Sequence, residues 1–397
     1  VTFQDGQQQA IDEGIVLYFK GPHSFTGEDV FELQCHGGPV VVDLLLRRCI
    51  ELGARLAKPG EFSERAFFNN KLDLAQAEAI ADLIASTSEE AARSAVRSLQ
   101  GEFSLEINSL LQQLVQFRVY IEAALDFPEE EIDFLADERV SKTLEDIQDH
   151  LASVQSKARQ GALLRDGMQL VIAGQPNAGK SSLLNALSGT DSAIVTEIAG
   201  TTRDVLRERI SLNGMPVHVI DTAGLRHSDD LVEQMGIARA WQELVKADLV
   251  LLLIDAQQGF GVAEQNILDE LPEGLPVIRV FNKIDKSAHT AGLIESDLYI
   301  SAKQHLGLDA LRAALVEQMG YRPQVEDVFI ARRRHLDALN MTRECLDLAS
   351  QQLREFNAGE LVAEELRRAQ NALGAITGQF SADDLLGEIF SSFCIGK

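Results

Sequence analysis

The chain has 397 residues, 45% of them apolar and 24% charged, as in soluble globular proteins, and its length predicts two or three domains. Its net charge of −25 excludes a broad basic face for nucleic acid, so any RNA partner must meet a local basic patch. No apolar run approaches the roughly 18 residues of a membrane span, and no signal peptide opens the chain, so we expect a cytoplasmic protein without a membrane partner.

The four cysteines are scattered without a C-x-x-C pair, which argues against a zinc site or a disulfide framework and favours a reducing compartment. The first residue is Val1 rather than Met, which is consistent with a fragment of a longer protein.

Residues 1–69 mix short strand-like runs with glycine and proline turns, which indicates a small α+β domain. Its predicted elements are strands over 15–19 and 30–33 and a helix over 40–52. Over residues 70–166, and again over 321–397, apolar side chains recur at helical spacing. We expect these two segments to be the halves of one helical domain.

Residues 167–320 alternate strand-like and helical segments, which predicts a parallel sheet with crossover helices. The candidate strands are 169–173, 217–221, 249–255, 277–281 and 298–300. The expected fold class is therefore α/β and α. A small N-terminal α+β domain precedes a central helical domain, into which a Ras-like P-loop G domain is inserted.

The segment from Gly174 to Ser181 matches the pattern G-x-x-x-x-G-K-[ST] and lies between a predicted strand and a predicted helix. Its glycines let backbone N–H groups wrap phosphates, and a helix N-terminus favours negative charge. Lys180 is expected to reach the β- and γ-phosphates, and Ser181 to bind Mg²⁺. This motif by itself indicates only a nucleotide.

Three further motifs follow, each at the end of a predicted strand, where open α/β sheets bind ligands. After the second candidate strand, Asp221 can hold Mg²⁺ through water and the Gly224 N–H can meet the γ-phosphate. Asp285, in the sequence Asn-Lys-Ile-Asp, can accept from guanine N1–H and the 2-amino group, donors that adenine lacks. The Ala302 N–H can meet guanine O6. The four motifs together predict a protein that binds and hydrolyses GTP.

The residues expected to bind GTP come from these motifs and from the segment between the first two of them. They are Asn177, Ala178, Gly179, Lys180, Ser181, Ser182, Thr196, Thr201, Thr202, Asp221, Thr222, Ala223, Gly224, Asn282, Lys283, Asp285, Ser301, Ala302 and Lys303. Thr202 is expected to close over Mg²⁺ when a γ-phosphate is present, which orders a loop that hydrolysis releases.

Leu225 stands where Ras-like switches place a Gln that orients the attacking water, so another group must hold the water here. Asn177 can lend its side-chain oxygen to a monovalent cation beside the phosphates. It can equally be a turn-forming residue of the loop with no ligand.

Five further motifs carry a resemblance to a known family. They are Ser24–Asp29, Gly37–Pro39, Pro59–Phe67, Asn70–Glu78 and Phe393–Lys397. With the GTP motifs they make the chain resemble, over essentially its whole length, the MnmE (TrmE) family of tRNA wobble-uridine modification GTPases. Members of that family open with a further strand-rich stretch that this chain lacks.

The resemblance implies a homodimer whose N-terminal domain binds a reduced folate, formyl- or methylene-tetrahydrofolate, with Glu32, Lys71 and Lys397 at the folate. It implies that Cys394 is a catalytic thiol near the folate, although an ordinary cysteine in a tail is an equal alternative. An FAD-containing partner, MnmG, would act with the chain on tRNA. Together they would install a carboxymethylaminomethyl or aminomethyl group on C5 of the wobble uridine.

The same resemblance implies the ligands and the hydrolytic group of the GTP site. Magnesium would be held by Ser181 and Thr202, and the attacking water would be oriented by Glu233. The potassium ligands would be Asn177, Thr196, Ile198 and Thr201. In the family the G domains meet across the cation when GTP is bound, which activates hydrolysis without an arginine finger.

Two basic features and two other functions complete the hypotheses. The run Arg332–Arg334 can touch tRNA phosphate or form a solvated helix face, and Arg226 can serve the contact between G domains. A ribosome-assembly GTPase of the Era or Der type would carry a KH-like domain or a second G domain. A dynamin-like protein would carry an amphipathic basic helix. The sequence shows none of these additions.

Overall fold

A computed structural model gives the fold. It describes residues 1–126, 138–188, 207–212, 214–221, 247–272, 274–322, 328–356 and 358–379, together with Ile389 and Phe393. The chain divides into two compact units: residues 1–84, 96–155 and 334–397 in one, and residues 85–95 and 156–333 in the other.

The N-terminal segment forms two antiparallel hairpins followed by two helices. In the first hairpin β1 (Thr2–Gln4) pairs with β2 (Ala10–Glu13), and in the second β3 (Ile15–Phe19) pairs with β4 (Val30–Gln34). The helices are α1 (Pro39–Glu51) and α2 (Glu61–Phe68). The expected α+β character is confirmed. Hairpin β1–β2 was not predicted, because its strands are short and largely polar.

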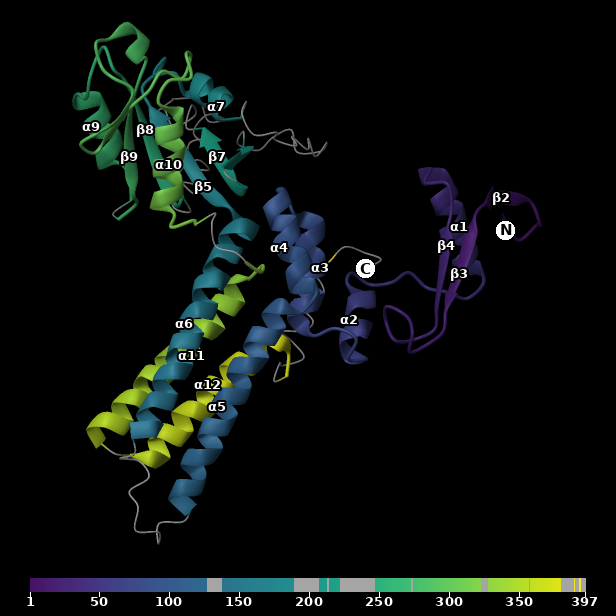
Figure 1. Cartoon of the computed structure of the whole chain (residues 1–397). Helices are drawn as coiled ribbons and strands as arrows, with labels where there is room; N and C mark the ends of the chain where they lie inside the picture. The colour runs from purple at the N-terminus through teal and green to yellow at the C-terminus, as the bar shows by residue number, and fades with distance from the viewer. Residues whose placement is uncertain are drawn as a thin grey trace. The chain divides into compact units, whose positions relative to one another are not determined.

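The helical part is assembled from two stretches that are distant in the sequence. Its elements are α3 (Leu74–Ala85), α4 (Glu89–Leu99), α5 (Glu102–Asp126), α6 (Glu138–Asp166), α11 (Arg333–Gln351), a π-helical turn (Gln352–Phe356) and α12 (Gly359–Thr377). Helix α5 packs along α12, and α6 is tied to α11 by a hydrogen bond from Gln148 to Asp347 (Figure 1). The expected pairing of the two helical halves is confirmed.

The second unit contains a seven-stranded sheet with the order β10-β11-β9-β8-β5-β7-β6. Its strands are β5 (Met168–Gly174), β6 (Arg207–Leu212), β7 (Met215–Asp221), β8 (Leu249–Asp255), β9 (Val277–Asn282), β10 (Gly292–Ile294) and β11 (Asp297–Tyr299). The five predicted strands are present and mutually parallel. The two antiparallel edge strands, β6 and β10, were missed, because β6 begins with charged residues and β10 has only three residues.

Helices cover this sheet, which explains the composition of its central strand. The described helices around it are α7 (Lys180–Ser188), α9 (Val262–Asp269) and α10 (Leu308–Gln318) (Figure 1). Every residue from Leu249 to Ile254 in β8 is at most 1% exposed, so the strand reads as a continuous apolar run. Because the central strands are parallel, their carboxyl ends share one edge of the sheet, which is where the motifs lie.

Helix α6 holds the chain where it leaves the sheet unit. The Gln160 side chain donates to the Gly320 carbonyl at 2.8 Å and accepts from the Arg322 N–H at 2.8 Å. The neighbouring Gly161 lies so close to the Phe329 carbonyl that a Cβ would overlap it. The segments that enter and leave the sheet unit are therefore bound to each other. None of the helices that the structure describes combines the length and apolarity that crossing a bilayer requires.

Candidate nucleotide-binding site

The loop after β5 has the geometry of a phosphate cradle. It runs from Gly174, the last residue of β5, to Lys180, the first residue of α7. The Lys180 ammonium folds over the loop and donates to the carbonyls of Gly174 at 2.9 Å and Gln175 at 3.3 Å. A cation and a helix N-terminus therefore face the same loop, an arrangement that suits phosphate. Ser181, the expected Mg²⁺ ligand, is the second residue of α7.

Asn282 joins three of the predicted motifs. Its side chain is 2% exposed and donates to the Ala178 carbonyl at 2.9 Å. Its Oδ1 accepts from the Ala302 N–H at 3.0 Å. Gly179 lies against the Asn282 amide, has φ of 103° and leaves no room for a Cβ, so the pattern requires glycine there. The phosphate loop and the predicted guanine motifs thus form one connected site.

Asp285 lies in a short 3₁₀ turn, η3 (Ile284–Lys286), directly after β9. The hydroxyl of Ser301, which is fully buried, donates to Asp285 Oδ1 at 2.6 Å and orients the exposed carboxylate. Ala302, the other residue expected at the guanine, has a partner within the protein. The Ala302 N–H, assigned to guanine O6, is engaged by Asn282, so a guanine oxygen would have to share or replace that bond. Lys303 follows as an exposed residue.

Asp255, the last residue of β8, belongs to the same edge of the sheet and was not predicted as a site residue. Its Oδ2 lies 2.8 Å from the Lys283 ammonium, and its Oδ1 accepts from the Gln257 N–H at 3.0 Å. Partial burial alone would raise the pKa of Asp255, but these hydrogen bonds outweigh it and hold the pKa below its usual value. The available signal was its position, because it is a carboxylate at the edge where the other motifs lie.

Several expected residues lie outside the described part of the chain. Asp221 is the last residue of β7, at the same edge of the sheet as Gly174. Outside the described residues are Thr196, Ile198, Thr201, Thr202, Thr222, Ala223, Gly224, Leu225, Arg226, Glu233, Cys394 and Lys397. The expected Mg²⁺ and K⁺ sets are therefore described only at Ser181 and Asn177.

The expected folate residues lie in the N-terminal segment. Glu32 is an exposed residue of β4, and the Lys71 ammonium donates to the Pro22 carbonyl at 3.0 Å. No hydrogen bond or ion pair joins these two described side chains. Phe393 of the C-terminal motif is buried in one cluster with Ile389, Leu74 and Ala77. That cluster brings Phe393, the first residue of the C-terminal motif, to the start of α3, three residues after Lys71.

A buried ion cluster lies in the helical part. Glu78 on α3 is 1% exposed and accepts from Arg334 Nε at 2.8 Å, Arg334 Nη2 at 2.6 Å and His335 Nε2 at 2.9 Å. Burial alone would raise the pKa of Glu78, but the neighbouring charges of His335 and Arg334 outweigh it and hold the pKa well below its usual range. Arg334 is therefore neither a solvated residue nor a phosphate contact, the two roles considered for the run Arg332–Arg334.

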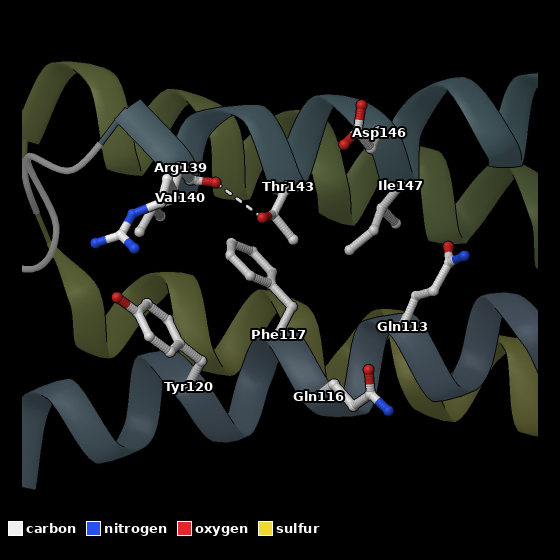
Figure 2. Close-up of a pocket in the computed structure, with 9 residues that line it drawn as sticks. All are labelled: Gln113, Gln116, Phe117, Tyr120, Arg139, Val140, Thr143, Asp146 and Ile147. Atoms are coloured by element: carbon white, nitrogen blue, oxygen red, sulfur yellow. Dashed lines mark hydrogen bonds between the residues drawn. The ribbon is translucent and has the colours of Figure 1, made fainter.

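A cavity of about 440 Å³ lies between α5 and α6 (Figure 2). Phe117, Val140 and Ile147 are its buried apolar lining, and Gln113 and Thr143 are among its polar groups. Both polar groups have protein partners: Gln113 bonds with His150 at 3.1 Å, and Thr143 donates to the Arg139 carbonyl at 2.8 Å. The lining includes Arg139 and Val140 from the first turn of α6, but no glycine-rich loop.

A mostly parallel sheet, a phosphate loop after β5 and a base-recognition turn after β9 define a Ras-like P-loop GTP-binding protein. Residues 1–71 match the family described as "GTP-binding protein TrmE N-terminus", and residues 74–394 match "MnmE helical domain". The chain belongs to the MnmE family of tRNA modification GTPases.

Individual members of this family match the whole chain. The tRNA modification GTPase MnmE of Hydrogenovibrio crunogenus is 57% identical over 399 residues, which cover 100% of this chain and 88% of that protein. The MnmE of Vibrio cholerae is 58% identical over 405 residues, with 100% and 89% covered. Among solved structures, Era of Aquifex aeolicus with bound GDP and AlF4⁻ is 28% identical, covers 46% of this chain and 67% of that chain, and has a TM-score of 0.30.

Proposed function

We propose that this GTPase works in the cytoplasm as a homodimer and uses GTP hydrolysis to drive modification of C5 of the tRNA wobble uridine. An FAD-containing partner, MnmG, and a tetrahydrofolate one-carbon donor complete the reaction. The main support is the arrangement around Asn282, which connects the phosphate loop to the base-recognition turn in a chain of the tRNA modification GTPase family.

The proposed roles in the GTP site follow the sequence motifs, and the described contacts of Lys180 and Asp285 support two of them. Lys180 neutralises the β- and γ-phosphates, and the Ser181 hydroxyl holds Mg²⁺ together with Thr202. The oriented Asp285 carboxylate selects guanine, because it can accept two N–H donors that adenine does not offer. Glu233 orients the attacking water, so Glu233→Ala should lower the turnover of GTP and leave GTP binding intact. Loss of GTP binding in that variant would contradict the assignment.

Potassium is the proposed activating cation. Asn177 has φ of 63°, a backbone conformation that Asn tolerates, and it stands in the phosphate loop. Its side-chain oxygen would join Thr196, Ile198 and Thr201 around K⁺ when two G domains meet. The turn-forming role explains Asn177 without a cation, so a comparison of hydrolysis in different salts decides between the two.

The folate site is proposed at Glu32, Lys71 and Lys397. A carboxylate can accept from the amino group and ring N–H of a pterin together, and ammonium groups can pair with the folate carboxylates. The packing of Phe393 beside Leu74 supports this grouping, because Phe393 is four residues before Lys397 and Leu74 is three residues after Lys71. Calorimetric titration with formyl-tetrahydrofolate should show weaker binding for Glu32→Ala and Lys71→Ala. If both variants bind formyl-tetrahydrofolate as well as the unaltered protein does, the proposed folate site is wrong.

The deciding experiment is complementation. Bacterial cells that lack their own family member receive the full-length protein, its Lys180→Ala variant or its Asp309→Asn variant, and their wobble uridines are analysed by mass spectrometry. The protein and the Asp309 variant should restore the C5 modification, and the Lys180 variant should not, because Asp309 is an exposed residue of α10. Full restoration by Lys180→Ala would refute a GTP-driven role.

A further inference from the structure

We propose that Asp255 is a positioning residue for guanine recognition, which acts through Lys283 and does not itself touch the nucleotide. The inference rests on the proposed role of Asp285 and adds a residue that supports the turn in which Asp285 lies. Asp255 ends β8, and Lys283 and Asp285 lie just after the neighbouring strand β9.

Three contacts connect the segment after β8 to the segment that carries Asp285. The Lys283 ammonium lies 2.8 Å from Asp255 Oδ2, and the Ala256 N–H donates to the Asn282 carbonyl at 2.8 Å. The Gln257 side chain donates to the Lys286 carbonyl at 3.1 Å. The turn η3 is therefore held at both of its ends by consecutive residues of one loop.

The backbone at Lys283 explains why such support is needed. Lys283 has φ of 68° and ψ of 35°, a left-handed conformation that is rare for lysine and persists where the surroundings fix it. The Asp255 carboxylate is 14% exposed and the Lys283 side chain 25% exposed, so water screens their ion pair only in part. Asp255 is itself held, because its Oδ1 accepts from the Gln257 N–H.

The other side-chain bonds of the turn lie on different residues, and the Lys283 backbone contributes one bond, in which its carbonyl accepts from the Lys286 N–H at 2.9 Å. Asn282 is bound to Ala178 and Ala302, and Asp285 is bound to Ser301. None of these bonds holds the Lys283 side chain, so loss of Asp255 releases that side chain. The phosphate loop keeps its own contacts, so the effect should fall on base recognition and leave the chemical step intact.

The test measures GTP hydrolysis by the full-length protein and by Asp255→Asn, which preserves the shape of the side chain and removes its charge. KM for GTP should rise about tenfold, the loss of one charge-assisted hydrogen bond, while kcat stays within about twofold of the unaltered protein. Asp309→Asn is the matched control, because it removes an exposed carboxylate that pairs with Arg312 on the same unit. Its KM should not change.

A double-mutant cycle identifies the route of the effect. In a Lys283→Met background, Asp255→Asn should raise KM no further, because its partner is already gone. Full additivity of the two changes, or an unchanged KM in Asp255→Asn, would overturn the inference. Gln257→Ala, a change at an exposed side chain, provides a second variant if Asp255→Asn fails to fold. It should raise KM by about two- to fivefold, and no rise would count against the inference.

The underlying assignment is checked separately. Asp285→Asn should shift nucleotide preference from guanosine towards xanthosine. If it does not, the proposed guanine site fails. If it does while the Asp255 and Gln257 variants behave as the unaltered protein, only the positioning role fails.

Discussion

Replacing Glu78 by Ala should strongly destabilise the helical part of the molecule. Glu78 is 1% exposed and accepts three hydrogen bonds from Arg334 and His335, and His335 is itself 2% exposed. Removing one partner of a buried ion pair costs about 3–5 kcal/mol, because the remaining charge is left uncompensated. Arg334 keeps its bonds to the carbonyls of Ala375 and Ile376, so we expect the lower end, about 3 kcal/mol.

The assay is thermal unfolding followed by circular dichroism, with and without saturating GDP. Unfolding of a multidomain chain is not a single transition, and bound nucleotide raises only the transition of the unit that binds it. The transition that GDP does not move should fall by about 6–12 °C, at about 2–4 °C per kcal/mol for a domain of 150–250 residues. The transition temperature of Glu78→Gln should fall less, because glutamine preserves the shape of the side chain and one of its two acceptor oxygens.

The control is Glu364→Ala, which removes an exposed ion pair with Arg367 on α12 and should leave unfolding unchanged. The reasoning would be refuted if Glu78→Ala and Glu364→Ala lowered the transition temperature equally. It would also be refuted if Glu78→Ala lowered only the transition that GDP raises. Acid provides a second check. The pKa of Glu78 is depressed in the folded state, so its contribution is complete above the usual value of 4.5 and is lost as the pH falls below it. The difference in transition temperature between the unaltered protein and Glu78→Gln should therefore become smaller below about pH 4.5.

Three further outcomes are expected. Asp285→Asn should move nucleotide preference towards xanthosine triphosphate in a competition assay, and an undiminished preference for GTP would contradict the guanine assignment. GTP hydrolysis should be faster in K⁺ than in Na⁺ at matched ionic strength, whereas equal rates would contradict the proposed K⁺ site. Gly161→Ala should lower the melting temperature, because its Cβ would overlap the Phe329 carbonyl at a cost of about 1–3 kcal/mol. Gly37→Ala, where a Cβ meets nothing within 4 Å, should not change it.

The central strands and the nucleotide motifs were predictable because each has a local cause. The strand β8 is a continuous apolar run, since it is buried on both faces. The glycine at 179 and the lysine at 180 sit at fixed spacing because the phosphate loop admits little else. Such patterns can be seen within ten residues of sequence, so the expected fold class was confirmed.

The features that were missed depend on residues that meet only in the folded chain. The cluster of Glu78 with Arg334 and His335 joins positions that are 256 and 257 residues apart. Nothing near Arg334 in the sequence distinguishes it from Arg332 and Arg333 in the same arginine run. The pairing of Asp255 with Lys283 and the engagement of the Ala302 N–H by Asn282 likewise depend on neighbouring strands. Edge strand β10 lacks the apolar signal because two of its three residues are exposed.

The bonds from Gln160 and the close approach of Gly161 to Phe329 have a consequence for the order in which the chain folds. The sheet unit is formed mainly from contiguous residues, whereas the two halves of the helical part must find each other across it. Closing a loop of roughly 160 residues costs about 2–3 kcal/mol more entropy than closing one of roughly ten. Once the sheet unit has folded, the Gln160 side chain is bonded to Gly320, where the chain leaves that unit. The effective loop between the two halves of the helical part is then short. The inserted unit thus acts as a folding aid for the helices on either side of it.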